Sequence, residues 1–325
     1  MKSIYVSDRY VKIWERYDKA TSLRIVLEND KAVFEIVLLV KRIVGEDDLF
    51  EAYTPYGYGG PVLIQGSQDA TFPFEKFVYE LAKRNIVDVF VRLSPFLKNQ
   101  RYFPMNILEL NRYTVSRTLS KMSHNDVLRT LSKGTKWSIR KSINCGVDIS
   151  LMNGKDIGKT EIANFHKLYS RSMKVANAAD YYFLNRECIK NHFAYLGDNA
   201  HLFVAKLDGR WIGASLFMRD ERMCHYHLAA SDRNFSRFYP ADRMLFEAIV
   251  FYGKEGKELV HLGGGLSLSE DDSLFRFKKK FGNTINEFYI GKLVVKNKLY
   301  EELRFKKGIR NSNYFLINDA LERKP

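Results

Sequence analysis

The order of predicted secondary-structure elements occurs twice along this chain, and this repetition constrains the fold more than any other feature. In the first copy, β-rich residues 22–28 and 32–40 flank a short polar turn and predict a hairpin. A third predicted strand at 49–53, a long loop, an amphipathic helix beginning near Phe74 and a fourth strand at 86–93 complete the copy.

The second copy has the same order of elements. Residues 201–207 and 211–218 predict a hairpin around an Asp-Gly turn, and residues 223–230 predict a third strand. An amphipathic helix that ends at Gly253 and a strand at 259–262 follow. Each copy therefore predicts a sheet with a helix packed on it.

A chain of 325 residues is long enough for two domains. We therefore predict an α/β (α+β) fold with residues 1–150 and 151–325 as tandem domains, each a mixed central sheet flanked by helices.

A hydrophobic content of 46% excludes a disordered chain. The sequence has no apolar run long enough to span a bilayer and no secretory signal, and its three scattered cysteines lack the spacing of disulfides or zinc ligands. These features predict a cytoplasmic protein.

The formal net charge of +14 favours anionic partners, among them RNA, diphosphates, nucleotide sugars and a membrane surface. Charge alone does not choose among these partners, and it is equally compatible with a role in solubility.

Lys278 is the most informative charged residue. Residues 269–282 predict a helix with acidic residues first and basic residues last, as the helix dipole favours. Leu274, Phe277 and Phe281 form its apolar stripe, and Lys278 lies inside that stripe. Such a lysine either extends past the apolar surface into solvent or meets an anion in a cleft, and we favour the cleft.

The three glycines Gly263, Gly264 and Gly265 directly follow a predicted buried strand. Ligands of α/β sheets gather at the carboxyl ends of strands, where glycine lets the backbone approach them. We therefore treat the three as candidate substrate-binding residues. A tight strand-to-helix turn is the alternative.

The loop at 54–61 alternates tyrosine and glycine. Its residues Tyr56, Tyr58, Gly59 and Gly60 offer stacking faces and unoccupied amides to a sugar or a nucleotide. The alternative is a glycine-rich turn with packed tyrosines.

A predicted helix after Gly134 combines Trp137, Arg140 and Lys141 on one face, a combination that suits a phosphate or an RNA end. The alternative is a solvated face with one packed tryptophan.

Elsewhere, His225 and His227 share one face of a predicted strand, but no third ligand is evident, so we predict no metal site.

The chain resembles the FemAB-like branch of the GNAT superfamily. The similarity covers nearly the whole chain, and its most specific part is the glycine turn followed by a Phe-Lys helix. The motifs that carry it are Arg117-Thr118-Leu119, Trp137 to Ile143, His201 to Ala205 with the turn at 208–210 and Gly213, Tyr239-Pro240-Ala241, Leu262 to Gly265, and Ser273 to Lys278.

This resemblance implies two tandem GNAT-like domains, the first on the acceptor side and the second on the donor and catalytic side. Known members transfer amino acids from aminoacyl-tRNA to an amine of a peptidoglycan precursor, and others are acyltransferases associated with cell-surface polysaccharide. The implied function is thus an acyl or aminoacyl transferase of cell-envelope biosynthesis with no bound cofactor. Phe277 and Lys278 match the family's Phe-Lys motif, which implies a place for Lys278 beside the donor and the developing charge, so both are candidate catalytic residues. We treat Tyr239 of the Tyr239-Pro240-Ala241 motif as a candidate substrate-binding residue.

Two departures from the family bear on the substrates. Peptidoglycan-type members usually carry Pro-Arg-Gly-Pro where this chain has the arginine-free loop at 55–61. Ordinary GNAT enzymes hold the CoA pyrophosphate with a glycine-containing loop, but residues 231–240 contain no glycine. We therefore favour aminoacyl-tRNA over acyl-CoA as donor, with a small-molecule or lipid-linked sugar or peptide as acceptor. A non-catalytic module that binds RNA or polysaccharide is the alternative function.

Overall fold

The computed structural model describes residues 3–119, 124–309 and 312–322. They form two compact units: unit 1 comprises residues 1–111 and 287–325, and unit 2 comprises residues 112–286. This division differs from the boundary predicted at residue 150. The chain passes from one unit to the other twice, once within β6 (Leu108–Thr118) and once within β12 (Thr284–Val294).

Strand pairing explains the difference. Residues 114–118 of β6 pair with β11 (Leu259–Gly264), so the segment after residue 111 belongs to unit 2. Residues 290–294 of β12 pair with β5 (Ile86–Arg92), which returns the C-terminal residues to unit 1. Periodicity identifies a strand, but it does not reveal which distant strand satisfies its backbone hydrogen bonds.

Unit 1 is a mixed sheet in the order β1-β2-β3-β5-β12, with β4 paired to β2. The hairpin and third strand predicted from the sequence are present. Strands β3 and β5 run parallel and are joined through helix α2. The bounds are β1 (Thr21–Asn29), β2 (Ala32–Arg42), β3 (Phe50–Tyr53), β4 (Val62–Gly66) and α2 (Phe74–Lys83).

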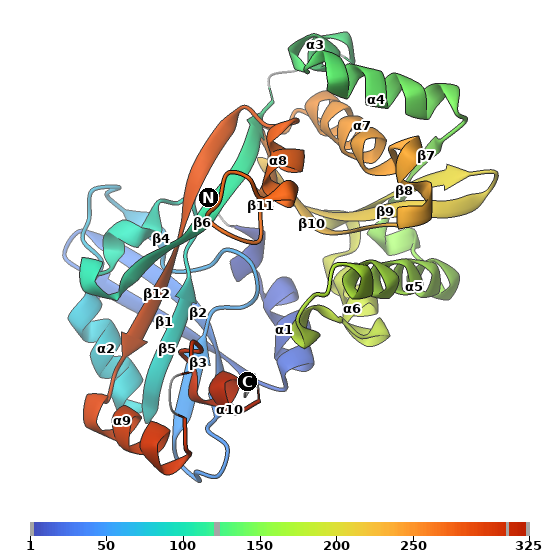
Figure 1. The fold of residues 1–325 in the computed structure, drawn as a ribbon. Helices are drawn as coiled ribbons and strands as arrows, with labels where there is room; N and C mark the ends of the chain where they lie inside the picture. Colours follow the sequence, from blue (N-terminus) through green and yellow to red (C-terminus); the bar gives the residue numbers. More distant parts are fainter. Residues whose placement is uncertain (1–2, 120–123, 310–311, 323–325) are drawn as a thin grey trace. The chain divides into compact units, whose positions relative to one another are not determined.

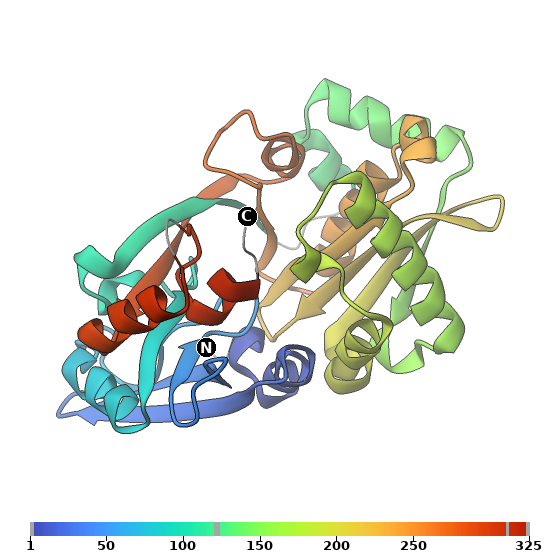
Figure 2. The same cartoon turned by 60° about the horizontal axis from the view of Figure 1, so that its bottom comes forward.

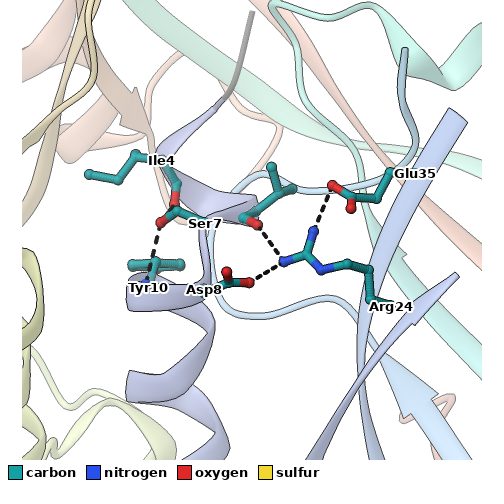
Figure 3. Close-up of polar contacts among 7 residues, drawn as sticks. Ile4, Ser7, Asp8, Tyr10, Arg24 and Glu35 are labelled. Carbon is teal, nitrogen blue, oxygen red and sulfur yellow. Dashed lines mark hydrogen bonds and ion pairs between the residues drawn. The ribbon is translucent and has the colours of Figure 1, made fainter. Parts of the chain in front are cut away.

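Three further helices complete unit 1: α1 (Asp8–Asp18), α9 (Asn297–Lys306) and α10 (Ile317–Glu322). Figure 3 shows the polar contacts that connect the start of α1 to strands β1 and β2. The Arg24 guanidinium pairs with Asp8 and Glu35 and donates to the carbonyl of Val6 at 3.3 Å. Ser7 caps the helix by accepting from the N–H of Tyr10.

In unit 2 the strands lie in the order β6-β11-β10-β9-β8-β7, with β10 and β11 parallel and the other neighbouring pairs antiparallel. Helices α3, α4 and α7 cover one face, and helices α5 and α6 cover the other (Figures 1 and 2). The bounds are α3 (His124–Thr130), α4 (Lys133–Asn144), β7 (Asp148–Asn153), α5 (Lys159–Val175), α6 (Arg186–Leu196), β8 (Ala200–Leu207), β9 (Arg210–Arg219), β10 (Met223–Ser231), α7 (Pro240–Lys254) and α8 (Ser273–Lys279).

The repeated order of elements is confirmed. In unit 2 the parallel strands β10 and β11 are joined through α7, as β3 and β5 are joined through α2 in unit 1. The predicted stop at Gly253 is wrong by a few residues, because α7 continues to Lys254 and the positive φ of +74° falls at Gly256. No helix among residues 3–119, 124–309 and 312–322 has the length and apolarity needed to cross a membrane.

Candidate active site

The glycine turn at the end of β11 is closely packed. Gly263 has a φ of +75°, which favours glycine. A Cβ atom added at Gly264 would lie 2.7 Å from the carbonyl oxygen of Tyr113, and one at Gly265 would lie 2.5 Å from a carboxylate oxygen of Asp272. The tight-turn alternative therefore accounts for the three glycines, while the carbonyl groups of Gly264 and Gly265 accept from neighbouring cations.

Lys278 lies against this turn. Its Nζ donates to the carbonyl of Gly264 at 2.6 Å, and the side chain is only 8% exposed, so it does not extend into solvent. The predicted apolar stripe is partly wrong, because Phe275 is buried whereas Leu274 is exposed. The buried face of α8 thus combines Phe275 and Lys278, which are three residues apart.

The surroundings of Lys278 lower the pKa of its amine. Burial lowers the pKa of its amine to about 7, and the nearby Arg112 guanidinium contributes to the lowering while Asp272 opposes it. Arg112 donates to the carbonyl of Gly265 at 2.8 Å. Near neutral pH, the side chain therefore exists both as an ammonium that donates a proton and as an amine that accepts one.

Asp272 holds the loop between β11 and α8. Its carboxylate accepts from the N–H groups of Leu266 at 2.7 Å, Ser267 at 3.2 Å and Phe275 at 2.8 Å, and the last bond caps α8. Burial would raise the pKa of this carboxyl, but the backbone N–H groups outweigh burial and lower it. Asp272 therefore stays ionised and positions the turn beside Lys278.

Tyr226 of β10 completes the surroundings of Lys278, with its ring centroid 6.0 Å from the Nζ atom. Burial raises the pKa of its hydroxyl to about 12, so the phenol stays protonated. Sequence reasoning missed Arg112, Asp272 and Tyr226. Asp272 carries the local signal of a helix cap, whereas strand pairing brings Arg112 and Tyr226 close, and no local pattern reveals that.

Phe277 lies in the core of unit 2 and is partly buried. Its ring meets that of Phe281 edge-on at a centroid distance of 5.8 Å, and the Nζ of Lys280 lies 5.5 Å from its centroid. These contacts describe a packing residue that supports α8.

A second group of predicted residues meets on the surface of unit 2. Trp137 of α4 is 54% exposed, and its ring meets that of Tyr239 edge-on at 5.5 Å. The Nζ of Lys141 lies 4.9 Å from the Trp137 centroid and 5.8 Å from that of Tyr239. Arg140 is exposed on the same helix. We call Trp137, Lys141 and Tyr239 the α4 platform.

Unpaired cations surround the α4 platform. Lys141 itself and five neighbouring cations form no ion pair within the part of the chain that the structure describes; the five are Lys133, Lys136, Arg140, Arg233 and Arg237. Lys280, by contrast, lies 3.5 Å from the buried carboxylate of Asp242. The platform therefore combines an exposed ring with positive charge that no carboxylate of the described residues neutralises.

The loop at 54–61 in unit 1 is more closely packed than predicted. The ring of Tyr56 lies 5.0 Å from that of Trp14, and the ring of Tyr58 meets that of Phe288 edge-on at 5.0 Å. The N–H of Gly59 is not unoccupied, because it donates to the carbonyl of Arg92 at 2.9 Å. A Cβ atom at Gly60 would lie 2.7 Å from the side chain of Asn99. Both tyrosine rings are half-buried.

The two predicted strand histidines lie among other histidines. His225 approaches His261 with 3.4 Å between their Nδ1 atoms, and His227 approaches His192 with 3.1 Å between their Nε2 atoms. Burial lowers the pKa of all four rings, to about 4 for His192 and about 3 for His225, so they are neutral at pH 7. Within the described ranges, no three His, Cys, Asp or Glu residues form a group that could hold a metal ion.

Comparisons with known proteins show what the chain is similar to. Residues 154–279 match the model of the acetyltransferase (GNAT) domain. The crystal structure of FemX superposes with a TM-score of 0.70 at 13% identity, covering 92% of this chain and 94% of that one. The chain is thus similar to FemX over nearly its whole length, and this likeness shows its fold. A tandem GNAT protein from the clavulanic acid biosynthesis pathway shares the fold with a TM-score of 0.51 at 8% identity, covering 90% of this chain and 89% of that chain.

A curated relative of the chain is the UDP-N-acetylmuramoylpentapeptide-lysine N(6)-alanyltransferase of Weissella viridescens. The two are 27% identical over 175 residues, which is 52% of this chain. The match spans about half the length of that relative, 49%.

Proposed function

We propose that this protein is an acyl or aminoacyl transferase that forms an amide on an amine of a cell-envelope precursor. The observation that carries the proposal is Lys278, a buried lysine at the end of β11 whose pKa is lowered to about 7. Lysines with perturbed pKa values cluster at functional sites, and a purely structural helix has no need of one on its buried face. The alanyltransferase relative supports the same reaction class.

In the proposed reaction, a neutral acceptor amine attacks the carbonyl carbon of an ester or thioester donor. The carbon–nitrogen bond forms, the carbonyl oxygen takes up the electron pair, and collapse of this intermediate breaks the bond to the leaving oxygen or sulfur. The proton lost by nitrogen goes to the leaving group. Lys278 as an ammonium stabilises the oxyanion, and its neutral form is able to carry the proton. Orientation of the two substrates supplies much of the remaining rate.

We propose aminoacyl-tRNA as the donor. The α4 platform suits this donor, because an exposed tryptophan stacks on a base while unpaired cations meet phosphates. Residues 231–240, which lead into α7, lack the glycine with which GNAT enzymes hold CoA. Trp137, Arg140, Lys141 and Tyr239 are then donor-binding residues.

The acceptor is an amine of a small-molecule or lipid-linked sugar or peptide. We assign acceptor binding to unit 1, where the half-buried rings of Tyr56 and Tyr58 offer apolar faces to a sugar or peptide. A cytoplasmic location and contact with a membrane surface are part of this proposal, because aminoacyl-tRNA is cytoplasmic and lipid-linked acceptors are membrane-bound.

The deciding experiment offers the two candidate donors separately to the same set of acceptors. The purified protein is incubated with a mixture of aminoacyl-tRNAs or with acetyl-CoA, together with amino sugars and a lysine-containing muropeptide precursor, and products are identified by mass. We expect an added aminoacyl residue on the acceptor, and we expect Lys278→Met to reduce its formation to near background. An added acetyl group would reverse the choice of donor. RNA binding without any transfer from either donor would instead identify a non-catalytic binding module, which the α4 platform also suits.

A further inference from the structure

Three charged residues lie side by side on one face of the unit 1 sheet. In the strand register, Lys41 of β2 pairs with Glu51 of β3, and Glu51 pairs with Asp88 of β5. Adjacent strands lie about 4.8 Å apart, so the two carboxyls are immediate neighbours. Glu51 is 1% exposed and Asp88 is fully buried. We call Glu51 and Asp88 the carboxyl pair.

The C-terminal helix α10 covers the carboxyl pair. The backbone N–H of Asn318 donates to a carboxylate oxygen of Glu51 at 2.9 Å. The Asn318 side chain also bonds the end of β2 and the residues after it, accepting from the N–H of Val44 and donating to the carbonyl of Arg42, each at 2.9 Å. At the other end of the row, Lys41 pairs with Glu322 at 3.2 Å. Glu51 is thus directly bonded to the C-terminal segment.

The carboxyl pair lacks the partners that two buried anions need. Asp88 forms no ion pair within the described residues, and the backbone N–H of Ile317 only partly offsets burial and Glu51, which raise the pKa of its carboxyl. The charged and titratable groups facing the pair are Lys41 from β2, Tyr300 and Arg304 from α9, and Asp319 from α10. Arg304 itself bonds the carbonyl of Tyr314 at 3.2 Å, so it is held away from a direct ion pair. Two negative charges at this separation in a water-poor site repel strongly.

We propose that the carboxyl pair is a proton-dependent clasp: α10 stays docked on unit 1 while the pair holds a proton, and it detaches as both carboxyls ionise. This device is independent of the proposed transfer reaction. The docked state keeps the proton because burial and mutual repulsion penalise the second charge. The detached state releases it, because exposed carboxyls ionise readily.

The direction of the pH dependence follows from proton linkage. Burial raises the pKa of Glu51 from 4.5 to about 8, and burial together with Glu51 raises that of Asp88. At pH values between the pKa of an exposed carboxyl and the raised pKa of the docked one, the docked state binds more protons than the detached state. Detachment releases at least one proton, so the opening equilibrium rises at least about tenfold per pH unit between about pH 5 and pH 8.

The test places a thiol under α10. Ala320 is 2% exposed, so an Ala320→Cys variant reports detachment by thiol modification, followed by peptide mass and normalised to the same peptide free in solution. We expect the protection of the introduced thiol to fall by at least about a hundredfold between pH 6 and pH 8, which is a tenfold change per pH unit over two units. Protection that stays flat over this range would overturn the proposal.

Two variants separate the clasp from general loosening of the segment. Glu51→Gln keeps an acceptor for Asn318 but cannot ionise, and we expect it to reduce the fall in α10 protection between pH 6 and pH 8, because only Asp88 then still releases a proton. Glu322→Gln removes only the ion pair with Lys41, and it should weaken docking equally at every pH. If Glu51→Gln showed the same pH dependence as the parent, the carboxyl pair would not be the clasp. Hydrogen exchange of residues 312–322 in the protein without the Ala320→Cys change gives the same readout if that variant fails to fold.

Discussion

The two units share a strand–helix–strand crossover but carry different buried titratable groups beside it. In unit 1, β3 and β5 carry the buried carboxyls Glu51 and Asp88 under the C-terminal helix. In unit 2, β10 and β11 carry neutral histidines, and Lys278 lies at the end of β11. Topologically equivalent strands therefore support a proton-holding pair in one unit and a weakened cation in the other.

The strand ends differ as well. In unit 1 the end of β5 is closed by the loop at 54–61, since Thr54 and Gly59 bond the backbone of Arg92. In unit 2 the end of β11 leads into glycines that leave room for Lys278 and Arg112 to reach their carbonyl groups. The comparison teaches that the fold fixes where a site can form, while a few side chains decide whether it does.

The largest effect we expect is an opposite response of the two units to acid. The pKa values of His192 and His201 are lowered to about 4, and that of His225 to about 3, by burial above all. Unfolded histidines bind protons below about pH 6.5, so unit 2 loses stability as the pH falls from 6.5 to 4, by on the order of 3 kcal/mol per histidine. Unit 1 gains stability over the same range, because the pKa of Glu51 is raised to about 8.

Tryptophan fluorescence separates the two responses. Trp14 lies in unit 1, whereas Trp137 and Trp211 lie in unit 2. A Trp14→Phe variant then reports on unit 2, and a Trp137→Phe/Trp211→Phe variant reports on unit 1. We expect the unit 2 signal to change first during acid titration. Coincident transitions would contradict the opposite pH responses.

Removing the charge of Lys278 should have the next largest effect. Loss of one oxyanion donor typically costs 10²–10³ in kcat, and we expect Lys278→Met to show a loss on the order of 10²–10³. Lys279→Met is the matched control, because Lys279 is exposed and pairs with Glu270 at 3.3 Å. The measurement is kcat for both variants, with thermal melts to verify folding. Equal activity in the two would remove Lys278 from the mechanism.

Local patterns in the sequence predict most elements of the fold but not their partners. The hairpin at 22–40 and the helix near Phe74 follow from periodicity and turn residues, and both are present. The return of residues 287–325 to unit 1 depends on pairing between β12 and β5, which are about 200 residues apart in sequence and which no local signal connects.

The candidate site shows the same limit. Lys278 stands out because a lysine interrupts an apolar stripe, and the structure places it at the glycine turn. The helix is rotated by one residue from the prediction, so that Phe275 replaces Leu274 on the buried face. Asp272 sets the first residue of α8 by capping the helix. From the sequence, its charge is explained by the helix dipole alone.

Lys278→Met should also stabilise unit 2 at neutral pH. Holding a lysine whose pKa is lowered from 10.5 to about 7 costs about 4 kcal/mol at pH 7, and the lost hydrogen bond to Gly264 offsets about 1 kcal/mol of that gain. The unfolded chain binds the extra proton only below about pH 10, so the advantage of methionine should shrink as the pH rises from 7 to 10. Melting temperatures at both pH values check this expectation. A variant less stable than the parent at pH 7 would show that the lysine packs without a desolvation cost.

The smallest effect concerns two exposed aromatic residues with different neighbours. Trp137 in unit 2 is 54% exposed, and the cations beside it form no ion pair within the described chain. Phe305 in unit 1 is 74% exposed and lies next to basic residues in the sequence. Of these, Lys306 and Lys307 form ion pairs with Glu46. Because stacking of one base contributes about 1–3 kcal/mol, Trp137→Ala should weaken RNA binding about tenfold, and Phe305→Ala should leave it unchanged. Arg140→Gln should reduce the slope of log affinity against log salt by about one, while Trp137→Ala leaves that slope unchanged, because only the arginine meets a phosphate. Fluorescence anisotropy with a single-stranded RNA at several salt concentrations measures both quantities. Equal losses for Trp137→Ala and Phe305→Ala would mean that ring exposure alone, and not the unpaired charge around the α4 platform, decides where RNA binds.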